Sequence, residues 1–161
     1  MKVAFIGHRK VENTEALKLK LTYLVTALIV KENADTFLFG SNSKFDDLSY
    51  ETVTKLKEIY PQIRRVYVRA SDEYLSHMCI EATLKYYEET FFPESVHNAG
   101  YRSYIKRNQA MIDMCDILVT YFNKDYTPYG KSRISRNSGT SLAVEYAEKK
   151  EKRIINLYEQ D

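Results

Sequence analysis

Small and hydroxyl-bearing residues at the start of the last expected helix could bind an anion. Ser138, Gly139 and Thr140 open that helix after a long polar loop. The first amides of a helix lack an intrahelical partner, and the helix dipole adds partial positive charge to them. Such a turn favours phosphate or carboxylate groups, and the hydroxyls of Ser138 and Thr140 could bind phosphate oxygens or cap the helix. The loop before the turn carries the basic residues Lys124, Lys131, Arg133 and Arg136.

Two further polar turns end apolar segments earlier in the chain. One consists of Gly7, His8 and Arg9, and the other begins with Gly40 and Ser41. His8 titrates near neutral pH, so it could act as an acid or base, or it could donate a hydrogen bond to phosphate while neutral. Together with the turn at 138–140, these segments suggest one phosphate-bearing ligand held across the end of a sheet.

Arg107 is another candidate ligand because a guanidinium can bind a phosphate or carboxylate through two hydrogen bonds. The alternative for Arg107 is a surface charge on an exposed helix face. We expect no metal site, because His77 and His97 have no matching ligands nearby, and no cofactor. The chain has no GxSxG, P-loop lysine or GxGxxG motif, which argues against esterase, ATPase and NAD-dehydrogenase functions.

Alternating strands and helices must position these turns. Apolar runs predict strands at 2–6, 36–39, 63–69, 117–121 and 153–158. Helical spacing predicts a first helix capped by Asn13 or Thr14, helical pieces within 72–89, and helices at 45–59, 101–115 and 139–150. The segments 90–100 and 122–138 are expected to be loops, the former with a short strand near Val96.

This order of elements predicts a single α/β domain over residues 1–161. The expected architecture is a three-layer, Rossmann-like parallel sheet flanked by helices. Ligands of such sheets bind beyond the carboxyl ends of the strands, which is where the turns at 7–9 and 40–43 and the loop 122–138 fall.

The composition is that of a soluble globular protein, with 44% hydrophobic and 29% charged residues. A net charge of +2 gives no reason to expect nucleic-acid binding. Cys79 and Cys115 are isolated, and no signal peptide or membrane-spanning run is present, so we expect a cytoplasmic protein and no membrane partner. The fourteen Tyr residues could stack on a base or sugar, or could serve core packing.

Several motifs, in this order, resemble those of the SLOG superfamily, and above all a small bacterial branch with a GHR motif. They are Gly7-His8-Arg9, the Gly40 to Asp46 turn, Arg107–Met111 followed by Cys115-Asp116, Gly139-Thr140, and Tyr146-Ala147. SLOG proteins are Rossmann-like nucleotide-ligand domains that include the LOG phosphoribohydrolases. The resemblance implies that the chain binds or senses a phosphate-bearing, nucleotide-derived ligand, such as a nucleoside monophosphate or an ADP-ribose derivative, and that it forms a homodimer.

The chain departs from this family at the catalytic position. Ala143 stands where LOG enzymes and deoxyribosyltransferases carry Glu, and Glu145 lies about 200° further around the helix. Arg136 to Ser138 also replace the family's first glycines. A nucleotide N-glycosidase or deoxyribosyltransferase activity therefore needs another carboxylate.

Asp46 is the candidate for that carboxylate, although it could instead cap its helix. Asp113 and Asp116 are expected at the opposite edge of the sheet, and Glu145 on a solvated helix face. A third possibility is an interaction protein with a vestigial pocket, in which the Tyr-rich segment 86–104 binds a protein partner.

Overall fold

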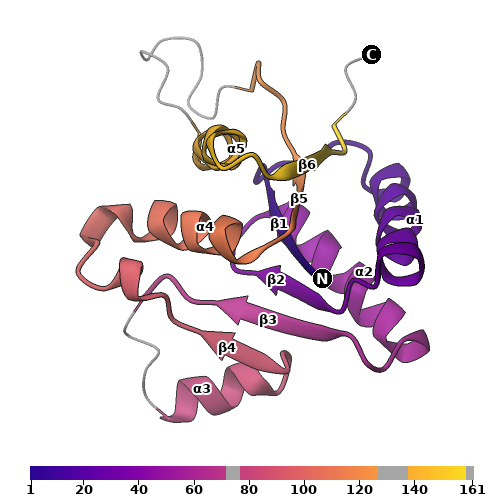
Figure 1. The fold of residues 1–161 in the computed structure, drawn as a ribbon, viewed down its shortest axis with the longest axis horizontal. Coiled ribbons are helices and arrows are strands. Elements are labelled where there is room, and N and C mark those ends of the chain that lie inside the picture. The colour runs from indigo at the N-terminus through magenta and orange to yellow at the C-terminus, as the bar shows by residue number, and fades with distance from the viewer. Residues whose placement is uncertain (72–76, 127–137, 159–161) are drawn as a thin grey trace.

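The computed structural model describes residues 1–71, 77–126 and 138–158, and its strands form one six-stranded parallel sheet (Figure 1). The strand order is β4-β3-β2-β1-β5-β6. The bounds of the strands are β1 Lys2–Gly7, β2 Thr36–Phe39, β3 Arg64–Val68, β4 Glu89–Phe91, β5 Ile117–Tyr121 and β6 Arg153–Asn156. Each neighbouring pair is parallel, as the register of β1 against β2 and β5 illustrates. The predicted Rossmann-like α/β class is therefore confirmed, and the order reverses between β1 and β5.

Helices cover both faces of the sheet (Figure 1). One face packs against α1 (Thr14–Glu32) and α2 (Lys44–Ile59), and the other against α4 (Ser103–Met114) and α5 (Gly139–Lys149). The alternation of β1 shows the division, because Val3 and Phe5 join the first layer while Ala4 and Ile6 join the second. The short helix α3 (His77–Leu84) contacts β4 at the edge of the sheet.

Polar caps start α1 and α2 at the carboxyl edge of the sheet. Asn13 accepts a hydrogen bond from the Ala16 amide and caps α1, which is one of the two predicted caps. The Ser43 hydroxyl caps α2 by accepting a hydrogen bond from the Asp46 amide (3.1 Å). The capping role considered for Asp46 is therefore wrong, and its carboxyl group is left for other contacts.

The other differences from the predicted elements are small. The expected strand near Val96 is wrong, since Glu94–Val96 forms a 3-10 helix after Pro93 and the edge strand is β4 instead. Most of the predicted loop 122–138, including Lys131, Arg133 and Arg136, lies outside the described residues. Within the described segments, no helix combines the length and apolarity needed to cross a bilayer.

Candidate functional site

Asp46 and Arg107 approach each other over the carboxyl ends of β2 and β3, although they come from opposite faces of the sheet. Asp46 is in the first turn of α2, and Arg107 reaches over the edge from α4. Both are charged residue types and both are almost completely buried, with 5% and 2% of their surface exposed. Charged side chains are rarely buried to this degree without a specific reason, so this pair is the most informative part of the site.

Arg107 is held by backbone carbonyls at the strand ends. Its Nη1 group donates to the carbonyls of Gly40 and Val68, and its Nε group donates to Asn108 Oδ1 (2.9 Å). Any side chain at Gly40 would place a Cβ 2.6 Å from the Val68 carbonyl oxygen and 2.8 Å from Arg107 Nη1. Glycine is therefore required by the protein's own packing, and the interpretation of Arg107 as an exposed surface charge is wrong.

The Asp46 carboxyl group is poised to exchange a proton near neutral pH. Burial raises its pKa to about 7, although the charge of Arg107 and hydrogen bonds from the Gly40 backbone and the Ser41 hydroxyl act to lower it. Its Oδ1 atom is buried and has no hydrogen-bond partner. A carboxyl group with this pKa and an unused acceptor suits proton transfer or the binding of a ligand hydroxyl.

Aromatic rings line the α2 side of this pair. Tyr87 lies 4.9 Å from Tyr50 and 5.2 Å from Tyr67, measured between ring centroids. Its pKa is raised, first by burial and then by the negative charge of Asp46, so its phenol lies near the carboxyl group. The sequence analysis placed Tyr87 in the Tyr-rich segment 86–104 as part of a possible protein-binding region, and it gave Tyr67 no role at this site.

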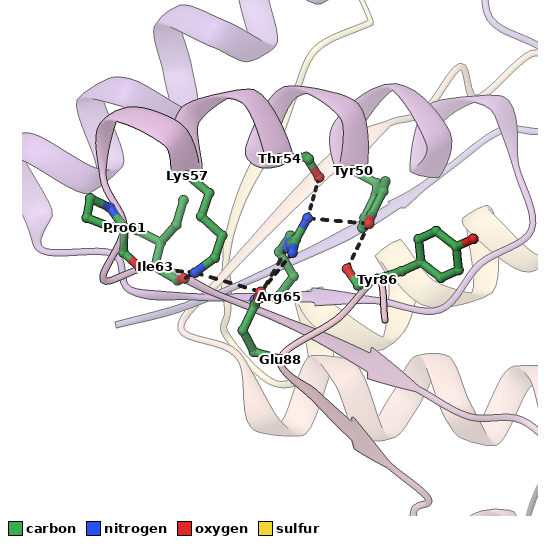
Figure 2. A network of polar contacts seen from close by, with 8 residues as sticks. All are labelled: Tyr50, Thr54, Lys57, Pro61, Ile63, Arg65, Tyr86 and Glu88. Atoms are coloured by element: carbon green, nitrogen blue, oxygen red, sulfur yellow. Dashed lines mark hydrogen bonds and ion pairs between the residues drawn. The ribbon is translucent and has the colours of Figure 1, made fainter. Parts of the chain in front are cut away.

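A polar network fixes the segment that carries Tyr87 (Figure 2). Arg65 on β3 binds the Glu88 carboxylate through Nη2 (2.7 Å) and Nε (3.2 Å), and it also donates to Thr54 on α2 (2.9 Å). The Tyr50 hydroxyl donates to the Tyr86 carbonyl (2.7 Å). Residues 86–88 are thereby fastened to α2 and β3.

His8, which follows β1, contacts the segment after β5. The Asn123 amide donates to His8 Nε2 (2.9 Å), and the imidazole ring lies 4.3 Å from the Tyr126 ring between centroids. Burial lowers the His8 pKa, although the Asn123 backbone acts to raise it. The same Nε2 atom also lies 3.2 Å from the Asn123 carbonyl oxygen, to which it donates when it carries the proton. His8 therefore positions the segment after β5.

The other residues of the first polar turn have separate roles. Gly7 lets Phe45 pack against the end of β1, because a Cβ at Gly7 would lie 2.4 Å from a ring carbon of Phe45. Arg9 is exposed, and its carbonyl accepts a hydrogen bond from the Lys44 amide (3.3 Å) at the start of α2. The turn at 7–9 thus connects the end of β1 with the helix that carries Asp46.

Three hydroxyl-bearing residues lie at the start of α5 and at the end of β5. Ser138 caps the helix by accepting a hydrogen bond from the Ser141 amide (3.0 Å), and Thr140 is buried in the first turn. Thr120 at the end of β5 is fully buried, and its Oγ1 atom has no hydrogen-bond partner. Thr120 faces the α4–α5 layer, on the same side of β5 as Leu118, which packs in that layer with Ala143. The sequence pattern of β5, an apolar run, gave no reason to single out Thr120.

The predicted site residues thus lie at three places along one edge of the sheet. The end of β2 brings together Gly40, Ser41, Asp46 and Arg107. The end of β1 carries Gly7 and His8, and the helix after β5 starts with Ser138, Gly139 and Thr140. Because β1 separates β2 from β5, the ends of these two strands are about 10 Å apart, which is two strand spacings. Asp116 lies at the opposite edge, as expected, where its Oδ2 accepts a hydrogen bond from the Lys2 amide (2.7 Å).

The other two acidic candidates from the sequence, Asp113 and Glu145, bind side chains of the protein itself. Asp113 binds the Tyr146 hydroxyl (3.0 Å), and Glu145 is exposed on α5 and accepts a hydrogen bond from Ser141 (3.3 Å). In the segments that the structure describes, no group of three or more His, Cys, Asp or Glu side chains is arranged to hold a metal ion. Comparison with protein-family models and with curated proteins finds no match for this chain.

Proposed function

We propose that this chain binds or senses a phosphate-bearing ligand derived from a nucleotide, such as a nucleoside monophosphate or an ADP-ribose derivative. The observation that carries the proposal is the pair of polar groups at one edge of the sheet, one at the start of α5 and the other around Asp46 and Arg107. A helix start suits a phosphate, and the distance of about 10 Å between the ends of β2 and β5 is compatible with the length of a nucleotide. The nucleotide class itself comes from the resemblance to the SLOG superfamily.

In this proposal the phosphate binds at the first turn of α5. The hydroxyl of Thr140 supplies a hydrogen bond in addition to the free helix amides. Arg9, which is exposed beside the end of β1, supplies positive charge. The sugar extends towards the Asp46 carboxyl group, whose unpartnered Oδ1 atom accepts a hydroxyl hydrogen.

Mass spectrometry on a nucleotide panel tests this proposal. The protein is incubated with AMP, GMP, deoxynucleotides, ADP-ribose, cyclic ADP-ribose and NAD, and retained and free compounds are compared after filtration. Thr140→Ala and Arg9→Ala should each weaken retention about tenfold or more, because each removes a hydrogen bond or charge at the phosphate. Thr22→Ala on α1 is the matched control. A panel that is not retained, or unchanged retention in both variants, contradicts the proposal.

A second candidate function, N-glycosidic cleavage of a nucleotide by hydrolysis or by deoxyribosyl transfer, is supported by one observation. Asp46 has a pKa of about 7 at this edge, which suits a general acid or base. In the same experiment this function predicts free base and a sugar phosphate in place of the intact ligand. Asp46→Asn should abolish base release, whereas Asp47→Asn at the exposed neighbouring position should preserve it. Base release that persists in Asp46→Asn excludes Asp46 from the reaction.

The proposal includes a homodimer in the cytoplasm, which the SLOG resemblance implies. Three large apolar residues on α1 are exposed, which is consistent with a contact surface: Leu19, Tyr23 and Val30. Size-exclusion chromatography with light scattering measures the oligomeric state directly, and a monomer at micromolar concentration contradicts this part of the proposal.

A further inference from the structure

One exposed aromatic ring borders the Asp46–Arg107 pair. Tyr104 lies one helical turn before Arg107 on α4, and the Arg107 Cζ atom is 5.9 Å from the centroid of the Tyr104 ring. In spite of this contact, 65% of the Tyr104 surface is exposed. The ring therefore contacts a buried cation on one side and leaves most of its remaining surface open to solvent.

The other tyrosines near the pair do not have an open ring. Tyr67 and Tyr87 are partly buried and pack against each other, with 5.2 Å between their ring centroids. Among these three tyrosines around the Asp46–Arg107 pair, Tyr104 is the one whose ring is mostly exposed and can contact a flat ligand group. A guanidinium behind the ring favours such contacts, because arginine and aromatic planes interact through the ring faces.

Nucleobases are the flat groups that a nucleotide ligand would bring to this position. Base–aromatic stacking tolerates different bases because every base has a π face. A ligand whose phosphate lies at α5 and whose sugar passes β1 would place its base near the ends of β2 and β3, where α4 carries Arg107 and Tyr104. The two neighbouring helices α4 and α5 would then hold the two ends of one molecule.

We propose that Tyr104 is the stacking surface for the nucleobase of the ligand bound at the carboxyl edge of the sheet. This inference rests on the proposed function, and it names the part of the site that recognises the base. Tyr104 acts through its ring, so an aromatic replacement preserves the contact and an aliphatic replacement of similar size removes it.

Isothermal titration calorimetry with two kinds of probe tests this role. The nucleotides are AMP, GMP, CMP, UMP and ADP-ribose, and ribose 5-phosphate is the probe that has the phosphate and sugar but lacks a base. The wild-type protein should bind at least one nucleotide about tenfold or more tightly than ribose 5-phosphate. Tyr104→Leu and Tyr104→Ala should abolish this preference and leave the affinity for ribose 5-phosphate unchanged. Tyr104→Phe should preserve it, and so should Tyr86→Ala, which removes a tyrosine side chain that is about as exposed as that of Tyr104.

The Leu and Phe variants separate stacking from folding. Both keep an apolar side chain over Arg107, and circular dichroism melting curves show whether each variant is folded. If Tyr104→Leu retains the preference, or if the wild-type protein binds ribose 5-phosphate as tightly as every nucleotide, the role of Tyr104 is overturned while the proposed function stands. If the wild-type protein binds none of these probes, the proposed function fails and the role of Tyr104 fails with it.

Discussion

Two arginine–carboxylate pairs close to β3 differ in how completely the partners satisfy each other. In the first, Arg65 and Glu88 form direct hydrogen bonds at the partly exposed side of β3. In the second, Arg107 binds backbone carbonyls, while the Oδ1 atom of the Asp46 carboxyl group is buried without a hydrogen bond. The first pair has the geometry expected of a stabilising contact, and the second leaves an acceptor unused.

The pKa shifts of the two carboxyl groups follow this difference. Burial acts to raise the Glu88 pKa, but hydrogen bonds from Arg65 and the charges of Arg65 and Lys57 outweigh it, so the pKa is lowered. For Asp46, burial outweighs the attraction of Arg107, and the pKa rises to about 7. A buried group that is poorly satisfied in the free protein costs stability, and such groups are concentrated at functional sites.

The largest effect is expected from removing the arginine of the buried pair. Arg107→Met should lower the free energy of unfolding by about 3–5 kcal/mol, the range found when one partner of a buried charged pair is lost. The carbonyls of Gly40 and Val68 lose their donor, and Asp46 loses the nearby positive charge. Urea unfolding at pH 8 measures the change.

Arg64→Met is the matched control for this measurement. Arg64 binds Glu89 at 2.5 Å, but both side chains are about half exposed, so the loss should stay below about 1 kcal/mol. Similar small losses in the two variants would mean that Arg107 does not support the strand ends.

The next prediction concerns the pH dependence of stability, which should differ between Asp46 and Glu88. Because the folded-state pKa of Asp46 is raised from 3.8 to about 7, the folded protein holds the proton more tightly than the unfolded chain. The contribution of Asp46 to stability therefore falls as pH rises from about 4 to about 7 and is constant above that range, with a total change of at most about 4 kcal/mol. Relative to the wild type, Asp46→Asn should become more stable as pH rises.

Urea unfolding of both proteins from pH 4.5 to pH 8 measures this difference, and each pH point compares the variant with the wild type so that other titrations cancel. A difference that is independent of pH would show that Asp46 does not titrate in the folded state within this range. A wild type that gains stability over Asp46→Asn with rising pH would show that the carboxylate has a close cationic partner.

The sequence predicted the strands and turns around this site better than the side-chain contacts within it. Apolar runs ended by Gly7 and Gly40 marked the ends of β1 and β2, and the order of elements placed these turns on one edge. The burial of Arg107 could not be predicted, because it depends on α4 lying across the sheet from α2 and on the space left by Gly40. Local preference also misled, since Asp is common in helix first turns, yet Ser43 caps α2.

The smallest of these effects concerns the satisfied pair. Glu88→Gln keeps the shape of the side chain but removes its charge, so the hydrogen bonds from Arg65 weaken without leaving a cavity. The free energy of unfolding at pH 7 should fall by about 1–2 kcal/mol, as for the loss of a charge-assisted hydrogen bond. Because the folded-state pKa of Glu88 is lowered, this contribution is present above about pH 4.5 and is lost as pH falls further.

The pH dependence of this variant therefore has the opposite sign to that of Asp46→Asn. Its deficit relative to the wild type should be constant from pH 6 to pH 8, and it should shrink when the urea experiment is extended below pH 4.5. Glu89→Gln, in the exposed pair with Arg64, serves as the control. If the Glu88→Gln deficit instead grew at low pH, Glu88 would resemble Asp46, and the contrast between a satisfied and an unsatisfied arginine–carboxylate pair would not hold.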